Sequence, residues 1–182
     1  MRTSEAEILV IPGLGGSGPD HWQSRWEAKL PTARLVAQAN WNRPELEAWR
    51  NRIVEETKRA ARPAILVAHS LGALAVAHAA PLLGEKVKGA FLVAPPSAKV
   101  LAGLDTVDPA FAAHEIERLP FPAIVIASRD DPFAPYDESE ALAFALGAEL
   151  VDAGLSGHIN SESGHGPWPE GLMRFAGFLK TL

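Results

Sequence analysis

Short apolar runs recur between longer segments of helical periodicity, and this alternation constrains the fold more than any other feature of the sequence. The runs at 65–67, 91–93 and 124–126 are continuously apolar, which is typical of strands buried on both faces. Such strands separated by helices form parallel sheets whose right-handed crossovers restrict the topology. We therefore predict an α/β fold, a three-layer sandwich with a mainly parallel six-stranded sheet. The expected strands are 7–11, 34–38, 64–68, 88–94, 123–127 and 149–152.

The segments between the strands read as helices. Leu46, Trp49 and Ile53 fall on one apolar stripe, as in a helix that packs one side against a sheet. Residues 71–83 are apolar nearly all round, which predicts a buried helix. The stretch 95–122 contains several prolines but is still apolar, so we expect it to pack against the rest of the chain rather than to act as a linker.

Length and charge exclude several classes of protein. The 182 residues suit a single domain, residues 1–182, whose core needs neither disulfides nor metals. A formal net charge of −5 without a basic run argues against a nucleic-acid partner. The chain has no cysteine, which removes disulfides, thiolate metal sites and a cysteine nucleophile. No stretch approaches the ~20 apolar residues of a membrane span, and no signal peptide is recognisable, so we expect a cytoplasmic protein without a membrane partner.

The strongest functional motif lies between Ala68 and Gly72. It reads Ala-His-Ser-Leu-Gly and joins an apolar strand to an apolar helix, as in the G-x-S-x-G turn that presents a nucleophilic serine. Such a turn strains the serine backbone and needs small residues two positions away on either side, which alanine and glycine satisfy. The helix would direct its positive end toward Ser70, where negative charge would develop. A simple helix cap at Ser70 is the alternative interpretation.

A serine nucleophile needs a base and an acid, which in this arrangement follow in the order Ser, Asp or Glu, His. After the fifth expected strand, Asp131 is favoured over Asp130 because it directly precedes a proline. An ordinary turn is the other interpretation of this Asp-Asp-Pro segment. After the sixth strand, His158 is the expected base, with His165 as the alternative. His69, beside the nucleophile, cannot easily turn its ring onto the same face, and packing or surface roles are expected for His21, His78 and His114.

A glycine-rich loop, residues 12–18, follows the first expected strand. Glycines let backbone N–H groups approach a ligand closely. We assign one oxyanion-hole donor to the N–H of Leu14 or Gly15 and the other to the N–H of Leu71.

The same loop also matches the G-x-G-x-x-G fingerprint of dinucleotide-binding proteins, through Gly13, Gly15 and Gly18. That alternative requires an acidic residue about 20 positions on, at the end of the second strand. The second expected strand ends in Gln38-Ala39-Asn40, with no acid. Dinucleotide binding is therefore the weaker interpretation.

Taken together, five segments resemble the small serine hydrolases related to retinoblastoma-binding protein nine. The resemblance covers essentially the whole chain and implies a minimal α/β-hydrolase fold without a large cap, no cofactor, and a triad of Ser70, Asp131 and His158. A protein-binding module on the same fold is the alternative, although an L-x-C-x-E segment is impossible in a chain without cysteine. The segments are 12–22, 68–72, 128–132, 157–160 and 166–171.

These observations predict acyl transfer from a small ester or amide to Ser70 and then to water. So short a chain leaves little room for a lid, which favours an open site and short acyl groups. No metal site is expected. Five residues near the candidate loops are candidates for an apolar substrate pocket, with plain packing as the equal alternative for each; they are Leu14, Trp22, Pro95, Phe133 and Trp168.

Overall fold

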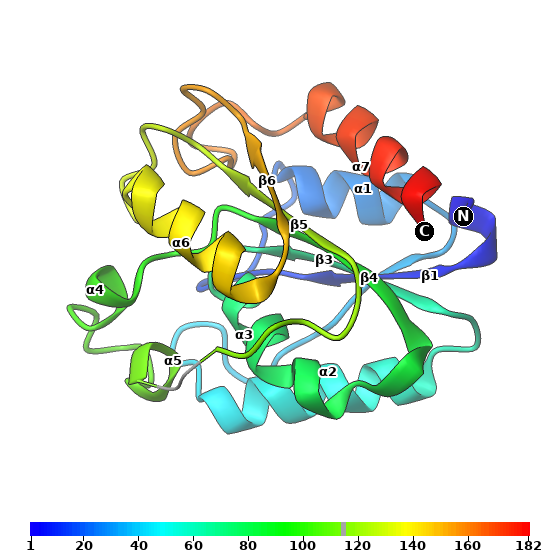
Figure 1. The fold of residues 1–182 in the computed structure, drawn as a ribbon, viewed down its shortest axis with the longest axis horizontal. Coiled ribbons are helices and arrows are strands. Elements are labelled where there is room, and N and C mark those ends of the chain that lie inside the picture. The colour runs from blue at the N-terminus through cyan, green and yellow to red at the C-terminus, as the bar shows by residue number, and fades with distance from the viewer. Residues whose placement is uncertain (114–115) are drawn as a thin grey trace.

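The computed structural model describes residues 1–113 and 116–182, so His114 lies outside the described residues. Six strands form one sheet in the order β2-β1-β3-β4-β5-β6, and all five neighbouring pairs are parallel (Figure 1). The predicted six-stranded parallel sheet is therefore confirmed. The strands are β1 Glu7–Ile11, β2 Ala33–Leu35, β3 Ala64–His69, β4 Val87–Val93, β5 Ala123–Ala127 and β6 Glu149–Asp152.

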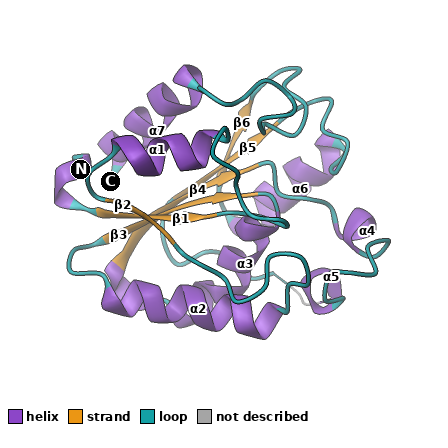
Figure 2. Cartoon of the chain, turned by 180° about the vertical axis from the view of Figure 1, so that it is seen from behind, coloured by secondary structure: helices purple, strands orange, loops and turns teal. Residues whose placement is uncertain are grey.

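Helices cover both faces of the sheet, as the second view shows (Figure 2). Three short 3-10 turns accompany them, at Thr3–Glu5, Ala80–Leu82 and Gly84–Lys86. The α-helices are α1 Trp22–Lys29, α2 Leu46–Arg59, α3 Leu71–Ala79, α4 Ala98–Leu101, α5 Ala110–Ala113, α6 Tyr136–Leu146 and α7 Pro169–Thr181.

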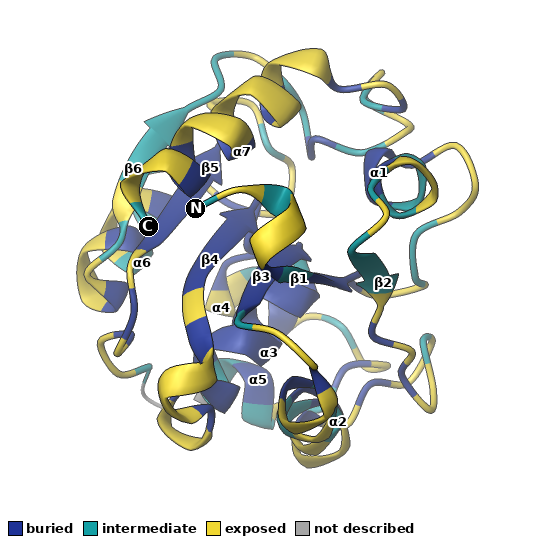
Figure 3. Ribbon diagram, turned by 90° about the vertical axis from the view of Figure 1, so that its right-hand side faces the viewer, coloured by how far each residue is buried: buried dark blue, intermediate teal, exposed yellow. Residues whose placement is uncertain are grey.

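Alternate residues of the central strands enter two different hydrophobic clusters. On β3, Leu66 and Ala68 pack with residues of α2, α3 and α6. Ile65 and Val67 face the other way and pack with the aromatic side chains of α1 and α7. Figure 3 shows the central strands largely buried between helices whose outer surfaces are exposed, whereas the edge strands β2 and β6 are only partly buried. Burial on both faces explains why these strands are continuously apolar in sequence.

Two elements differ from their predicted bounds by more than one residue. The second strand was expected at 34–38, but β2 pairs with β1 only from Ala33 to Leu35, because it is the edge strand and the chain then leaves the sheet. The helix expected over 71–83 is α-helical only to Ala79. A 3-10 turn follows there, because Pro81 has no N–H to donate to the preceding turn.

The proline-rich stretch after β4 packs against the body of the protein, as predicted for its described residues. It carries α4 and α5, and Leu101, Val107 and Phe111 are buried in the cluster that covers the α2 and α3 face of the sheet. None of the helices in the described part of the chain is both long and apolar enough to cross a lipid bilayer.

Because the strands are parallel, the loops that follow their carboxyl ends meet at one edge of the sheet. The glycine-rich loop follows β1, Ser70 follows β3, Asp131 follows β5 and His158 follows β6. The fold thus brings four segments that are far apart in the sequence to one place.

Candidate active site

Ser70 occupies a sharp turn between β3 and α3. Its φ of 54° and ψ of −129° are a strained combination for a residue with a side chain. Its N–H donates to the carbonyl of Val93 at 2.9 Å, which ties the turn to the neighbouring strand β4. A Cβ atom on Gly72 would lie only 2.5 Å from the carbonyl oxygen of Ile11, so the chain requires glycine two residues after Ser70. The predicted strain and the need for a small neighbour are both present.

The side chains of Ser70, His158 and Asp131 form one hydrogen-bonded series. Nδ1 of His158 lies 3.0 Å from both carboxylate oxygens of Asp131, and Nε2 lies 2.9 Å from Oγ of Ser70. A carboxylate only accepts hydrogen bonds, so Nδ1 carries the proton and Nε2 is left to accept one from the serine hydroxyl. The His158 and Asp131 side chains are only 9% and 2% exposed, which strengthens this charge-assisted contact.

The alternative acid and base have other contacts. Asp130 accepts hydrogen bonds from Oγ of Ser128 at 2.7 Å and from the N–H of Gly157 at 2.8 Å. These two bonds lower the pKa of Asp130 and connect the loop after β5 to the loop after β6. His165 contacts Oγ of Ser163 at 3.2 Å and packs edge-on against Trp168. The structure thus brings Asp131 and His158 to Ser70, while Asp130 joins the two loops.

The glycine-rich loop lies against the Ser70 turn. A Cβ atom on Gly13 would come within 2.8 Å of Cβ of Ser70 and 3.2 Å of the Leu71 nitrogen. The N–H of Gly15 donates to the carbonyl of Trp41 at 2.8 Å, so its assignment as an oxyanion donor is wrong. Leu14 remains the candidate donor from this loop. The N–H of Leu71 is the first of α3, and the first N–H groups of an α-helix have no carbonyl partner within it.

Two further imidazoles, those of His69 and His21, continue from the His158 ring as a series of neighbouring rings. Nε2 of His69 lies 2.8 Å from the carbonyl oxygen of His158 and donates to it, since a carbonyl only accepts. The His69 ring is 4.8 Å from the rings of both His158 and His21, centroid to centroid. Burial, with smaller repulsion from neighbouring imidazoles, lowers the pKa of His69 well below its usual value and that of His21 to about 4. Both imidazoles are therefore uncharged at neutral pH.

Two adjoining cavities open beside Ser70. The first, the apolar arm, has a volume of about 190 Å³, and its own lining residues include Pro96, Val100, Leu101, Leu104, Val107 and Phe133. The second, the polar arm, has a volume of about 200 Å³ and is lined on its own side by Gly13, Gly16, Gly18, His21, His69 and Ser161. Both arms share Leu14, Ser70, His158, Asn160 and Glu162.

Three of the expected pocket residues lie elsewhere. Trp22 and Trp168 are 0% and 6% exposed and pack in the aromatic cluster beneath α1 and α7. The Trp22 Nε1 atom donates to the carbonyl of Ile159 at 2.9 Å, so it supports the His158 loop from below. Pro95 lines a neighbouring cavity of about 340 Å³, whereas the next residue, Pro96, lines both cavities. The expectation that these three residues line the pocket at Ser70 is wrong, since two are core residues and one faces the next cavity.

The remaining two expected pocket residues, Leu14 and Phe133, do line the apolar arm, and Phe133 packs edge-on against His158 with ring centroids 4.5 Å apart. Sequence reasoning missed the rest of that wall, which comes from α4 and the turn after it. Val100, Leu104 and Val107 are spaced like one face of a helix in the stretch after β4, and that signal could have pointed to them. Within residues 1–113 and 116–182, no cluster of three or more His, Asp or Glu side chains is arranged as a metal site.

A parallel sheet of this order, with a serine on the turn between β3 and α3, has the fold of the α/β hydrolases. The chain belongs to the serine hydrolase family, whose model matches residues 8–177. The resemblance inferred from the motifs is thereby confirmed.

Individual relatives agree with this assignment. The chain is 28% identical to YdeN of Bacillus subtilis over 167 residues, which cover 87% of this chain and 88% of that protein. A solved structure of a YdeN-like protein from Pectobacterium atrosepticum has a TM-score of 0.86 and 34% identity, covering 98% of this chain and 93% of the other. Thermogutta terrifontis esterase 2 shares the fold, with a TM-score of 0.72 and 16% identity over 100% of this chain and 85% of the esterase.

Proposed function

We propose that this chain is a carboxylesterase-like serine hydrolase that cleaves small esters or amides through an acyl-enzyme on Ser70. The observation that carries the proposal is the unbroken hydrogen-bonded series from Asp131 through His158 to Ser70, at the strained turn after β3. Such a series activates a hydroxyl that is otherwise a weak nucleophile.

In the acylation half-reaction, Nε2 of His158 accepts the Ser70 proton while Oγ attacks the substrate carbonyl carbon. The carbonyl oxygen becomes an oxyanion, for which the N–H groups of Leu14 and Leu71 are the proposed donors. The tetrahedral intermediate then collapses, the bond to the leaving group breaks, and His158 returns the proton to the departing alcohol or amine. Asp131 keeps the proton on Nδ1 throughout and stabilises the imidazolium.

In the second half-reaction, water replaces the leaving group. His158 accepts a proton from the water as its oxygen attacks the acyl carbon, and it then gives the proton to Oγ of Ser70 as the acid is released. No cofactor and no metal takes part in either half of this scheme.

The size of the site supports small substrates. Each arm, at about 190 and 200 Å³, is smaller than the pockets of about 300–1,000 Å³ that hold drug-sized ligands, so each half of the substrate is small. Esters are the first class to test, since a protein of the same fold is named an esterase.

The test is labelling with a fluorophosphonate, which phosphonylates activated serines, followed by mass spectrometry of the peptides. We expect the adduct on Ser70 in the wild type, and strongly reduced labelling in His158→Ala. Ser70→Ala is the matched control and should fold normally without being labelled. An unlabelled Ser70 in well-folded protein would contradict the proposal and favour a non-catalytic, protein-binding role.

A further inference from the structure

We infer that the polar arm accepts cationic or neutral substrate groups and disfavours anionic ones, and that Glu162 sets this preference. The inference rests on the proposed function, because it concerns the substrate of the same site. According to this inference, the charge of the leaving group determines which esters, thioesters or amides the site accepts.

Glu162 lies where the two arms meet. It lines both cavities, its side chain is exposed, and within residues 1–113 and 116–182 it forms no ion pair. None of the described residues lining either arm is a lysine or an arginine. The carboxylate of Glu162 thus has no opposite charge beside it to neutralise its field.

The histidines of the polar arm do not offset this charge at neutral pH. Burial lowers the pKa of His21 to about 4, and it lowers the pKa of His69 well below its usual value. Neither imidazole therefore carries a positive charge that could attract an anion. A phosphate or sulfonate in this arm would meet glycine and serine residues, Leu14, Asn160, the His158 ring, two further uncharged imidazoles and one carboxylate.

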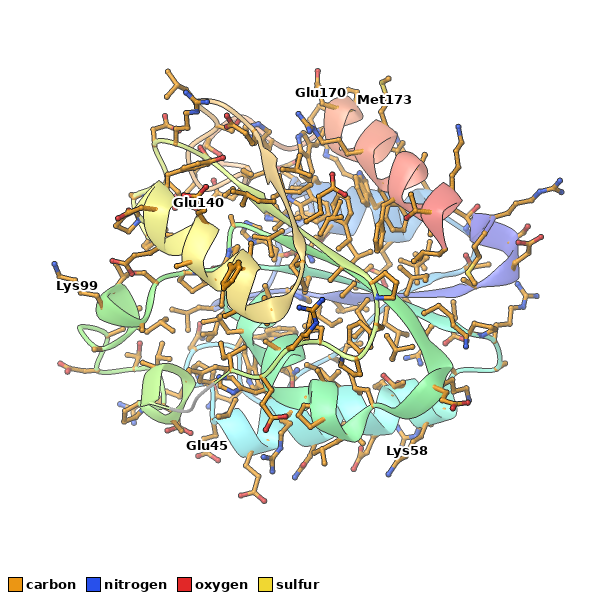
Figure 4. All side chains as sticks on the ribbon, viewed as in Figure 1. Glu45, Lys58, Lys99, Glu140, Glu170 and Met173 are labelled. Atoms are coloured by element: carbon orange, nitrogen blue, oxygen red, sulfur yellow. The ribbon has the colours of Figure 1, made fainter. Side chains whose placement is uncertain are left out.

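The cations on neighbouring segments are directed elsewhere. Arg25 pairs with Asp20 at 3.0 Å, and Arg129 forms its ion pair with Asp152. Lys99 is on α4, beside the apolar arm, but its side chain extends away from the molecule (Figure 4). The net charge of −5 adds a repulsive field of the same sign for an anionic substrate.

The two arms also differ in which half of the substrate they suit. A carbonyl carbon within reach of Ser70 lies between them, so the acyl chain and the leaving group extend in different directions. The apolar arm, with Val100, Leu104 and Val107, suits a short acyl chain. The leaving group then occupies the polar arm, so the charge on the leaving group is the one that interacts with the Glu162 carboxylate.

The experiment compares three butyryl thioesters with the same acyl group. The thiols are thiocholine, which is cationic, N-acetylcysteamine, which is neutral, and 3-mercaptopropanesulfonate, which is anionic. One thiol reagent detects all three products, and the enzyme contributes no background because the chain has no cysteine. The measured quantity is kcat/KM for each thioester in the wild type, Glu162→Gln and a control variant.

We expect the wild type to prefer the thiocholine ester over the sulfonate, and Glu162→Gln to reduce this ratio by at least about threefold. That size follows from the energies of exposed charge pairs, each of which corresponds to about a two- to fivefold change. Removing the Glu162 charge should lower kcat/KM for the cationic ester and raise it for the anionic ester. The neutral ester should change little. Raising the ionic strength from about 0.1 M to 1 M, where the screening length falls from about 10 Å to 3 Å, should reduce the wild-type ratio similarly.

Glu85→Gln is the matched control. Glu85 is exposed and precedes β4, so it lies at the opposite end of the parallel sheet from Ser70. The Glu85→Gln substitution removes the same charge from the protein and should leave the ratio of kcat/KM for the thiocholine and sulfonate esters unchanged. An equal loss of preference in both variants would overturn the assignment to Glu162, since net charge would then explain it.

A second measurement does not depend on turnover. The probes are two organophosphorus esters whose leaving groups differ only at their end, which is a trimethylammonium group in one and a neutral tert-butyl group in the other. We expect the cationic ester to inactivate Ser70 faster than the neutral one. Glu162→Gln should remove most of that difference. Equal rates in the wild type would overturn the inference while leaving the hydrolase proposal intact, whereas failure of the fluorophosphonate to label Ser70 would overturn the hydrolase itself.

Discussion

The buried imidazole of His69 donates a hydrogen bond of 2.8 Å to the backbone carbonyl of His158, so one histidine supports the segment that carries the other. His69 lies at the end of β3 and His158 follows β6, so this bond joins two segments that are distant in the sequence. It therefore ties the backbone of His158 to the last residue of β3, directly before Ser70.

Replacing His69 tests this support. His69→Leu leaves the buried carbonyl unpaired, at a cost of about 1–3 kcal/mol in the free energy of unfolding. We also expect kcat to fall at least tenfold, because a small displacement of a catalytic group is costly. His69→Gln retains a donor and should recover much of both losses. Denaturant unfolding and ester kinetics measure them, and equal kcat in the leucine variant and the wild type would contradict the positioning role.

Two alanine variants distinguish the candidate bases. His158→Ala should lower kcat/KM for a small ester by at least about a thousandfold, because it removes the group that accepts the Ser70 proton. His165→Ala should stay within about tenfold of the wild type, since His165 contacts Ser163 and Trp168 instead. The opposite order of losses would assign the base to His165.

A matched pair of asparagine variants distinguishes the two acidic residues. Asp131→Asn should lower kcat by up to about 10⁴-fold, because the amide no longer holds the proton on Nδ1 of His158. Asp130→Asn keeps an acceptor oxygen for Ser128 and Gly157 and should affect thermal stability more than kcat. Thermal melts measure the stability of both variants, and ester kinetics measure their kcat. Comparable kcat values for the two variants would contradict the role of Asp131 as the acid that orients His158.

The depressed pKa of His21 makes stability depend on pH. Burial lowers this pKa to about 4, whereas an unfolded histidine titrates near about 6.5. Between these values the unfolded chain binds more protons than the folded one, so the free energy of unfolding falls as the pH decreases.

His21→Asn isolates this contribution. Asparagine can still accept from the N–H of Gln23 at the start of α1, as Nδ1 of His21 does at 3.2 Å. Between pH 7 and pH 4 the free energy of unfolding should decrease in both proteins. We expect the decrease to be smaller in the variant than in the wild type, by up to about 3 kcal/mol. Urea unfolding at both pH values measures the difference, and parallel losses in the two proteins would show that His21 does not titrate as described.

The sequence alone determined the layered fold and the order of the chemical groups along it. Continuously apolar runs such as 65–67 report strands buried on both faces, because a parallel sheet covered by helices leaves no polar side. The pattern around Ser70 is equally local, since its small residues stand within two positions of the serine, although the contact that requires Gly72 is with Ile11 on β1. Patterns of this kind depend on neighbours a few residues away, so they can be recognised in a single sequence.

Only the tertiary structure decided which side chains share a cavity. Trp22 and Trp168 are close in sequence to functional loops but pack beneath them, while Val100 and Leu104 come from a stretch without a motif and form the wall beside Ser70. The N–H of Gly15 is engaged by Trp41, a contact across 26 positions that no local pattern encodes. Burial and hydrogen-bond partners depend on how distant segments pack, and the sequence specifies that packing only through the fold as a whole.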